Sequence, residues 1–489
     1  MAERLPVTVQ FCGTPFDRTA IIHTLRHLAM RVGWVFCAQA TYRVLYVTDL
    51  AELSHTEVTG RDVLVLSSPG VAQHLACRTD PIPLGRMYDG QQLPFPHPTR
   101  ALEERAGWIM ADVIAGAYAV LNLWYERRTR PVTQEGWFNF TDDWWVQAGM
   151  TAPQPVVDDW LERLLIAARQ RGWPKAFTQA RHRNTGFAGT LVLTHDVDYL
   201  PTQRNRGLPR LGRALVRQTL TRRRVPDAFR ILLRYAYAFP GALPYFALPD
   251  IARREEQYGV RSSFQLTVAR HHHADPTYDV HVRLIAEALR RLHRDTWEVG
   301  LHGSYTASRT PGRLAAERST LEQLLGAPVI GHRQHYLHFH PAQLFGEAEQ
   351  AGFSYDSSVG YNDCSGPRAG TLFPYRPYNI EAVRPHQLWE IPFVVMDTTL
   401  ATTYRFAPEA AWQHLQTVFS RYQGCVAIIW HQEQLSGLLD PGFDQLYYRF
   451  VGWAREVGLR LLSGQALLPE LEQAWGATVR GDGLDLQNL

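Results

Sequence analysis

LVLTHDVDYL, residues 191–200, joins an apolar run directly to Asp196 and Asp198. The apolar run is typical of a buried β-strand, where an ionised carboxylate is unfavourable unless it is paired or binds a metal. One Asp-x-Asp pair is weak evidence, because a chain of this length is expected to contain about one by chance. The deciding question is whether other buried strands of the chain also end in residues that bind metal or move protons.

From residue 190 onward, short apolar runs alternate with helical segments, the pattern of a parallel α/β barrel or a doubly wound sheet. The expected strands are residues 191–198, 261–268, 297–302, 328–335, 353–360, 389–397 and 425–431. Helices are expected between them over residues 280–293, 313–326 and 341–352. The last two end in Gly326 and Gly352, where a left-handed C-cap is expected.

Residues able to bind metal, move a proton or carry charge end six of these seven expected strands. They are Asp196 and Asp198, His302, Arg333 and His335, Asp356, Asp397, and His431. In a barrel of parallel strands the C-terminal ends converge on one face, where such enzymes build their active sites. Histidines scattered through a core would not follow the strand ends in this way. The sequence therefore predicts one site formed by these segments together.

A divalent cation suits the first members of this set. Zn²⁺ in a catalytic site takes about three protein ligands and keeps one position open for water, and Asp198 and His302 are natural ligands for it. Asp196 lies two residues before Asp198 and therefore points to the same side of the strand. We expect Asp196 to take the proton of a water that attacks a carbonyl group.

The remaining strand ends suggest supporting roles. His431 is expected to protonate a leaving nitrogen, and Arg333 to hold Asp196 as a carboxylate by lowering its pKa. Either Asp356 or Asp397 is expected to orient His431, as a carboxylate beside a histidine commonly does. The sequence does not say which of the two does so, and the other is expected to cap a loop.

Several segments resemble, in order, the motifs of one known family. THDVD resembles a T-F-D-D-G motif, RSSFQL a second strand usually written ATFF, EVGLHGSYT an H-S-x-x-H motif, GHRQHY an R-x-P-Y motif, FSYDSSVGY a D-x-x-D region, and IIWH a closing L-x-H motif. The family is the polysaccharide deacetylases, carbohydrate esterase family four, which residues from about 190 to 465 resemble. The resemblance implies a distorted (β/α)7 barrel, with Asp196 as base and Asp198 as metal ligand.

The chain departs from the family at its second metal-binding histidine. Four residues after His302 the family has another histidine, and here that position is Thr306, whose hydroxyl is a poor zinc ligand. His335 replaces the usual proline of the R-x-P-Y motif and is the candidate replacement ligand. The alternatives are that His335 is an active-site histidine that never touches metal, or that the site holds a weakly bound ion, a different ion or none.

The residues before 190 have a pattern of their own. Apolar runs at 7–12, 42–50 and 61–68 are expected strands, and 18–33 and 111–128 are expected helices, without a Gly-rich phosphate loop or a ligand cluster. The family resemblance suggests a bacterial subgroup with an added N-terminal α/β domain, for which packing or recognition is the expected role. The expected division is an N-terminal α/β domain over 1–150, a linker and helical connection over 151–189, the barrel over 190–470 with a basic insertion at about 201–247, and a C-terminal tail over 471–489.

Composition narrows the class of protein. A hydrophobic content of 45% and 14 Trp describe a globular chain, and a net charge of +3 gives no case for nucleic acid. Five cysteines without CxxC spacing suit reduced thiols. The first residues lack a signal-peptide pattern, and no stretch is long and apolar enough to span a membrane. A cytoplasmic location is therefore expected.

Two polar segments remain. Residues 203–234 hold ten arginines and one acid, Asp227, with Arg210, Arg213 and Arg217 at helical spacing. Such a segment either contacts an anionic membrane or phosphorylated substrate, or is a solvated helical insertion over the barrel mouth. RHHHAD, residues 270–275, is expected in a loop near the site mouth, because three adjacent histidines cannot all face one ion.

These observations predict a metal-dependent hydrolase, with Zn²⁺ as the expected ion, that removes an N-acetyl group from a sugar or glycan precursor. The backbone N–H of Tyr305 or a neighbour is expected to stabilise the oxyanion with the metal. One alternative is a catalytically inactive saccharide-binding or assembly protein on the same barrel, which Thr306 favours. Another is a hydrolase of non-sugar C–N amide bonds. The sequence does not indicate an oligomeric state.

Overall fold

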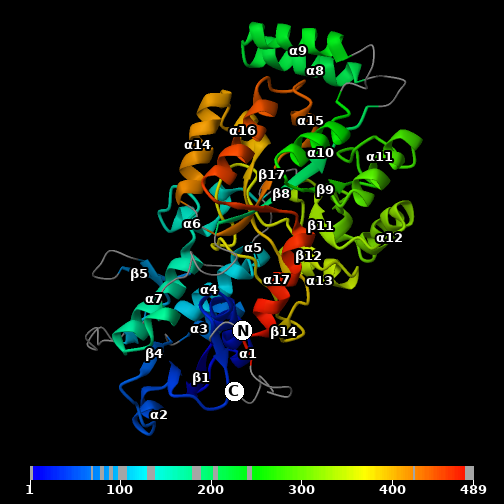
Figure 1. Cartoon of the computed structure of the whole chain (residues 1–489). Helices are drawn as coiled ribbons and strands as arrows, with labels where there is room; N and C mark the ends of the chain where they lie inside the picture. The colour runs from blue at the N-terminus through cyan, green and yellow to red at the C-terminus, as the bar shows by residue number, and fades with distance from the viewer. Residues whose placement is uncertain are drawn as a thin grey trace.

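The computed structural model describes most of the chain (Figure 1). The described residues are 4–67, 70–77, 82–86, 92–96, 107–128, 138–178, 189–201, 207–238, 245–421 and 424–479. Residues 203–206 of the Arg-rich segment and residues 480–489 of the predicted tail therefore lie outside the described part. Figure 1 shows the N-terminal elements, in blue, at one end of the molecule and the helices α8 and α9, in green, at the opposite end.

The N-terminal residues form a parallel sheet of five strands in the order β2-β1-β3-β4-β7. The strands are β1 (Leu5–Cys12), β2 (Trp34–Phe36), β3 (Tyr42–Val47), β4 (Asp62–Leu66) and β7 (Trp108–Ile109). Short elements beside them are α2 (Leu50–Ser54), α3 (Val71–Cys77), β5 (Leu84–Arg86) and β6 (Gln92–Pro94). The three strands that the sequence predicted in this region are β1, β3 and β4. Each is an apolar run, a pattern that indicates a buried strand.

Further helices belong to this part of the chain, of which the first contacts β2 and the last contacts β4 and β7. They are α1 (Arg18–Val32), α4 (Val113–Leu121), α5 (Trp124–Arg128), α6 (Trp144–Gln147) and α7 (Val156–Gln170). Asp17 caps α1 by accepting a hydrogen bond from the Ala20 amide, and Gly33 ends the helix at φ 82°. The single helix expected over 111–128 is wrong: it divides into α4 and α5 because Leu123, with φ 51°, leaves the helical region.

The second sheet is curled and parallel, with the order β15-β12-β11-β10-β9-β8-β17-β16, and β18 also pairs with β8. Its strands are β8 (Thr190–Val197), β9 (Ser263–Leu266), β10 (Glu298–Gly303), β11 (Gly331–Gln334), β12 (Tyr355–Asp356), β15 (Trp389–Glu390), β16 (Phe393–Met396), β17 (Cys425–Ile429) and β18 (Arg460–Leu462). The two ends of this order, β15 and β16, are consecutive pieces of one expected strand. The α/β class is confirmed, whereas the count of seven strand–helix units stays a prediction.

Helices surround the curled sheet (Figure 1). They are α10 (Leu248–Gln257), α11 (Arg283–Arg294), α12 (Arg313–Leu325), α13 (Pro341–Gln350), α14 (Pro408–Arg421), α15 (Gln432–Leu435), α16 (Phe443–Glu456) and α17 (Gly464–Gly476). The expected left-handed glycines are confirmed, with φ 71° at Gly326 and 82° at Gly352. Between β12 and β15 the chain has no helix among its described residues and instead pairs β13 (Tyr378–Asn379) with β14 (Arg384–Pro385).

The Arg-rich segment forms two helices joined by a π-helical turn. These are α8 (Leu208–Val216), the turn Arg217–Thr221 and α9 (Val225–Ala238). We call residues 207–238 the α8–α9 hairpin. Among the described residues, no helix is long and apolar enough to cross a membrane.

Buried charges connect the N-terminal elements to the second sheet. Asp158 on α7 forms an ion pair with Arg31 of α1 at 2.7 Å and accepts a hydrogen bond from the Leu372 amide at 2.8 Å. The C-terminal end of the described chain also returns to the first sheet, because the Phe36 amide donates to the carbonyl of Thr478. The domain boundaries given above stay a prediction.

Candidate active site

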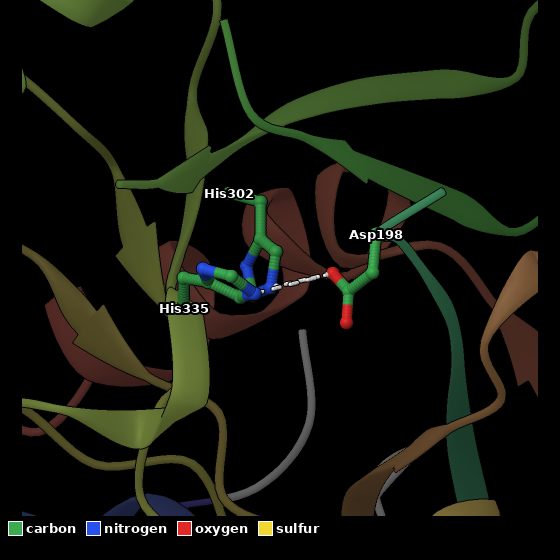
Figure 2. A group of neighbouring side chains, drawn as sticks. All are labelled: Asp198, His302 and His335. Carbon is green, nitrogen blue, oxygen red and sulfur yellow. Dashed lines mark ion pairs between the residues drawn. The ribbon is translucent and has the colours of Figure 1, made fainter. Parts of the chain in front are cut away.

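Three residues from different strand ends meet at one point in the second sheet. Asp198 follows β8, His302 lies in β10, and His335 follows β11. Their candidate ligand atoms all lie within 4.8 Å of one another. The Nε2 atoms of His302 and His335 lie 3.4 Å and 3.7 Å from Oδ1 of Asp198, and Figure 2 shows both rings directed at this carboxylate. The structure thus forms a candidate three-residue metal site.

The surroundings of these residues fit a bound cation. Oδ1 of Asp198 is buried and has no hydrogen-bond partner, although an anionic oxygen is costly to bury unpaired. The Nδ1 atom of His302 lies 3.0 Å from the backbone carbonyl of Arg333, and Nδ1 of His335 lies 3.4 Å from Oδ1 of Asp275. These contacts leave both Nε2 atoms directed at Asp198, as a metal-ligating histidine requires. One carboxylate and two imidazoles form a ligand set typical of catalytic zinc.

Thr306 does not take part in this arrangement. Its hydroxyl accepts a hydrogen bond from Nη1 of Arg313 at 2.7 Å. The position four residues after His302 is therefore occupied by a side chain whose oxygen serves another contact. His335, which comes from the neighbouring strand, supplies an imidazole nitrogen to the group instead.

Asp196 is fixed by an arginine that is fully buried. Nη1 of Arg333 donates to Oδ1 of Asp196 at 2.8 Å and to the hydroxyl of Thr194 at 2.7 Å. Burial raises the pKa of Asp196, but the charges of Arg333 and His302 outweigh burial and give a net lowering. Burial also raises the pKa of Asp198, but His335 and His302 outweigh burial and lower this pKa strongly. Both carboxyls therefore stay ionised near neutral pH.

His431 faces the same group from the end of β17. Its Nδ1–H donates to Oδ1 of Asp397 at 2.6 Å, and its backbone amide donates to Oδ2 of the same carboxylate at 3.0 Å. Its Nε2 lies 3.5 Å from Oδ2 of Asp198. Burial would lower the pKa of His431, but the carboxylates of Asp397 and Asp198 raise it well above its ordinary value. Near neutral pH this imidazole is a proton donor held at the site.

Asp356, expected as one of two candidates to orient His431, lies elsewhere. It accepts a hydrogen bond from Nδ1 of His332 at 2.6 Å and from the Ser358 amide at 3.0 Å. Strand register explains this, because Asp356 pairs with His332 across β11 and β12, whereas β16, which ends beside Asp397, pairs with β17. The structure therefore does not bring Asp356 to His431, whose Nδ1 contacts Asp397 instead.

Asp275 is a site residue that the sequence interpretation missed. Its Oδ1 accepts the backbone N–H of Tyr305 at 2.6 Å, and its Oδ2 accepts those of His271 and His272. Burial raises the pKa of Asp275, but the contact with His335 and these amides lower it to about 2. The Tyr305 N–H, one of the expected donors to the oxyanion, donates to Asp275 here, and the oxyanion role of a neighbouring N–H stays a prediction. The sequence signal that could have found Asp275 is RHHHAD, whose final aspartate is the residue that contacts His335.

A cavity of about 940 Å³ opens onto these residues. On one wall the rings of His272, Tyr305 and His338 form a stack, with centroid separations of 4.3 Å and 4.0 Å and interplanar angles of 12° and 8°. On another wall Glu433, also missed from sequence, lies beside Arg210 of α8. Burial, together with the Asp198 carboxylate, raises the pKa of Glu433 to about 7 despite the Arg210 charge.

The backbone beside His335 is strained at the cavity wall. Tyr336 and Leu337 have φ values of 59° and 52°, in the left-handed region that non-glycine residues rarely adopt. Such conformations cost of order 1–3 kcal/mol each and persist where the surrounding structure fixes them. Here the turn carries His335 from the end of β11 to Asp198.

Comparisons with known proteins give a limited result. No protein-family model matches the chain, and no curated protein matches it. A chitin deacetylase from the fungal pathogen Colletotrichum lindemuthianum is 12% identical, with coverage of 62% of this chain and 91% of that chain and a TM-score of 0.31. A polysaccharide deacetylase from Bacillus cereus is 10% identical, with coverage of 57% and 94% and a TM-score of 0.31.

A third similar structure is a CE4 family pseudoenzyme from Bacillus anthracis. It is 12% identical, with coverage of 60% of this chain and 67% of that chain and a TM-score of 0.29. At TM-scores this low the likeness assigns no activity to this chain, so the functional conclusion rests on the side chains of the site.

Proposed function

We propose that the chain is a metal-dependent hydrolase that removes an N-acyl group from a sugar or glycan precursor. The acyl group that we propose is acetyl. The observation that carries the proposal is the meeting of three groups at one end of the curled sheet, beside the cavity. They are the Asp198–His302–His335 cluster, the Asp196–Arg333 pair and the His431–Asp397 pair. Together they offer a metal site, a base and an acid.

Asp198, His302 and His335 would hold the cation, with Zn²⁺ as the expected ion. When bound, the ion would supply Lewis-acid polarisation of the substrate carbonyl and lower the pKa of a nearby water. His302 and His335 must both present neutral Nε2 atoms for this. The carbonyl of Arg333 and the carboxylate of Asp275, at their Nδ1 atoms, favour the tautomers that do so.

The protein groups then divide the proton transfers between them. Asp196, held ionised by Arg333, accepts the proton of the attacking water. His431, held protonated by Asp397, gives its Nε2 proton to the departing amine as the carbon–nitrogen bond breaks. Acetic acid and the free amine are the products. Asp196 has gained one proton and His431 has lost one, and proton exchange with solvent restores both groups.

The cavity wall suits a sugar ring. Flat aromatic faces give apolar contact with the C–H face of a pyranose, and the edges of the histidine rings offer polar groups to hydroxyls. The stack of His272, Tyr305 and His338 provides such a face at the mouth of the site. We therefore place the sugar against this stack, with its acyl amide directed toward Asp198.

Metal removal and reconstitution test the proposal. Protein treated with a chelator should regain one ion per chain from Zn²⁺, Co²⁺ or Ni²⁺, measured by mass spectrometry of metal content. It should then release acetate from N-acetylated oligosaccharides. An Asp196→Asn variant should bind the ion and release no acetate above background.

Each other outcome has a clear meaning. Sugar binding without metal uptake or acetate release would replace the hydrolase with the saccharide-binding protein that Thr306, turned toward Arg313, favours. Acetate release only from N-acetylated amines without a sugar would keep the machinery and change the substrate class.

A further inference from the structure

The α8–α9 hairpin is fixed to the rim of the cavity by ion pairs on its inner side. Arg210 pairs with Glu433, Arg222 pairs with Asp440, and Arg234 pairs with Asp444 at 2.8 Å. Apolar side chains of both helices also pack together over Leu438 in a small core of their own. The hairpin is therefore held in place rather than free to swing over the site.

The outer side of the hairpin is unusually apolar. Of the large apolar side chains that the structure describes, the six most exposed all lie on it. They are Leu220 at 74%, Val225 at 62%, Phe229 at 60%, Leu208 at 56%, Leu233 at 55% and Val216 at 54%. On α8 and its π-helical turn these residues follow the spacing of one helix face, opposite the buried Leu211 and Ala214. A concentration of this kind marks a surface that meets another apolar phase.

Positive charge accompanies this apolar surface. Arg213, Arg223 and Arg230 are exposed on the hairpin, and Asp227, which pairs with Arg230, is the single acidic residue of 203–234. The whole chain has a net charge of only +3, so the remainder is net negative. A second copy of the chain docked face to face here would bring two arginine-rich surfaces together, which electrostatic complementarity opposes.

We propose that the α8–α9 hairpin docks in the interface of a bilayer that contains anionic lipids. Basic helices with apolar faces lie in the plane of such an interface, with the apolar face among the acyl chains and the arginines at the headgroups. The outer helix layer visible in Figure 1 suits this orientation. Arg210 and Arg213 of α8 and Arg217 of the turn also line the cavity, so docking places this wall of the cavity about one helix diameter, 10 Å, from the membrane surface.

Vesicle co-sedimentation of the full chain tests the proposal. The protein should sediment with vesicles of phosphatidylcholine and phosphatidylglycerol, more weakly as salt is raised, and not with phosphatidylcholine alone. Leu220→Ser together with Phe229→Ser should lower the partition coefficient by about tenfold or more. A control with Val58→Ser and Val457→Ser, which changes exposed apolar residues elsewhere, should bind as the unchanged chain does.

A second variant separates the lipid charge from the apolar contact. Arg223→Gln with Arg230→Gln keeps the apolar face and should lower binding to anionic vesicles by about fivefold for each arginine removed. Failure to sediment with anionic vesicles, or equal binding by the Leu220/Phe229 variant and its control, would overturn the proposal. So would dimers in sedimentation velocity that the Leu220/Phe229 variant dissociates, because the surface would then be a self-association interface. The proposal does not depend on the hydrolase activity.

Discussion

Two clusters of histidine and carboxylate lie in the same curled sheet, and they differ in what they face. In one, Asp198 and His335 line the cavity beside His302, and Oδ1 of Asp198 is buried without a hydrogen-bond partner. In the other, His332 and Asp356 are fully buried and bond each other at 2.6 Å. Histidine and carboxylate in contact therefore do not define a site. Access to the cavity distinguishes the first cluster from the second.

Alternation along the strands explains the difference. Successive side chains of a strand point to opposite faces. Arg333 points inward to Asp196, so His332, one residue earlier, points to the outer face. Directly after β12 the Ser357 hydroxyl accepts a hydrogen bond from Arg333 on the inner side, so Asp356, one residue earlier, points outward beside His332. The first cluster can do chemistry on a ligand, and we expect the second to contribute only to stability.

The largest expected effect is on kcat, and it should separate Asp397 from Asp356, the two carboxylates that accept a hydrogen bond from a histidine Nδ1. Asp397→Asn removes the charge that keeps His431 protonated, so kcat for acetate release should fall by about 10³-fold and the pH optimum should move to lower pH. Asp356→Asn, the matched change in the outer cluster, should leave kcat within about twofold, because Asp356 touches no reacting group. Steady-state kinetics over a pH series measures both. A similar loss of kcat in the two variants would contradict the assignment.

Asp356 should instead matter for the free energy of unfolding. Asp356→Ala leaves His332 buried without its carboxylate, and removing one partner of a buried pair costs about 3 kcal/mol or more. The free energy of unfolding, measured with urea, should fall by that amount while metal content stays at the unchanged level. A variant that keeps its stability but loses the ion would place Asp356 in the active site after all.

Metal affinity distinguishes His335 from Thr306. His335→Ala removes one of three ligand groups and should weaken Zn²⁺ binding by about 100-fold or more, whereas Thr306→Ala should change it little, because the hydroxyl contacts Arg313. Competition with a chromophoric chelator measures both constants. Equal affinities in the two variants would mean that the third ligand lies elsewhere.

The sequence predicted the second sheet and most of the inner cluster for one reason. Short apolar runs mark its strands, and the residues that end these runs have few chemical roles in common other than metal binding and proton transfer. Asp196, Asp198, His302, Arg333, His335, Asp397 and His431 all come together at one place. Asp397 was separated from Asp356 only by the structure, because a strand end does not reveal which face its last side chain points to.

The residues that the sequence missed depend on contacts between distant segments. Asp275 acts through amides of its own loop and of Tyr305, thirty residues away. The position of Asp275 beside His335 could not be inferred from the sequence, because it depends on how that loop folds. Glu433 follows His431 by two residues, but its elevated pKa arises from burial under α8, which only the folded hairpin provides. Local pattern gives strands and their ends, whereas loop and insertion contacts come from the tertiary structure.

The smallest expected effect concerns a proton held in the outer cluster. Burial, with the neighbouring Asp356 carboxylate, raises the pKa of Glu390 well above its ordinary value. In the unfolded chain this carboxyl loses its proton above about pH 4.3, while the folded protein keeps it. The free energy of unfolding should therefore fall as pH rises from that point, by at most about 1.4 kcal/mol per pH unit from this group. Glu390→Gln cannot lose a proton, so urea unfolding from pH 5 to 7 should show a smaller decline than in the unchanged chain. An identical pH dependence in both proteins would mean that Glu390 is ionised in the folded protein, which would contradict the raised pKa of this carboxyl.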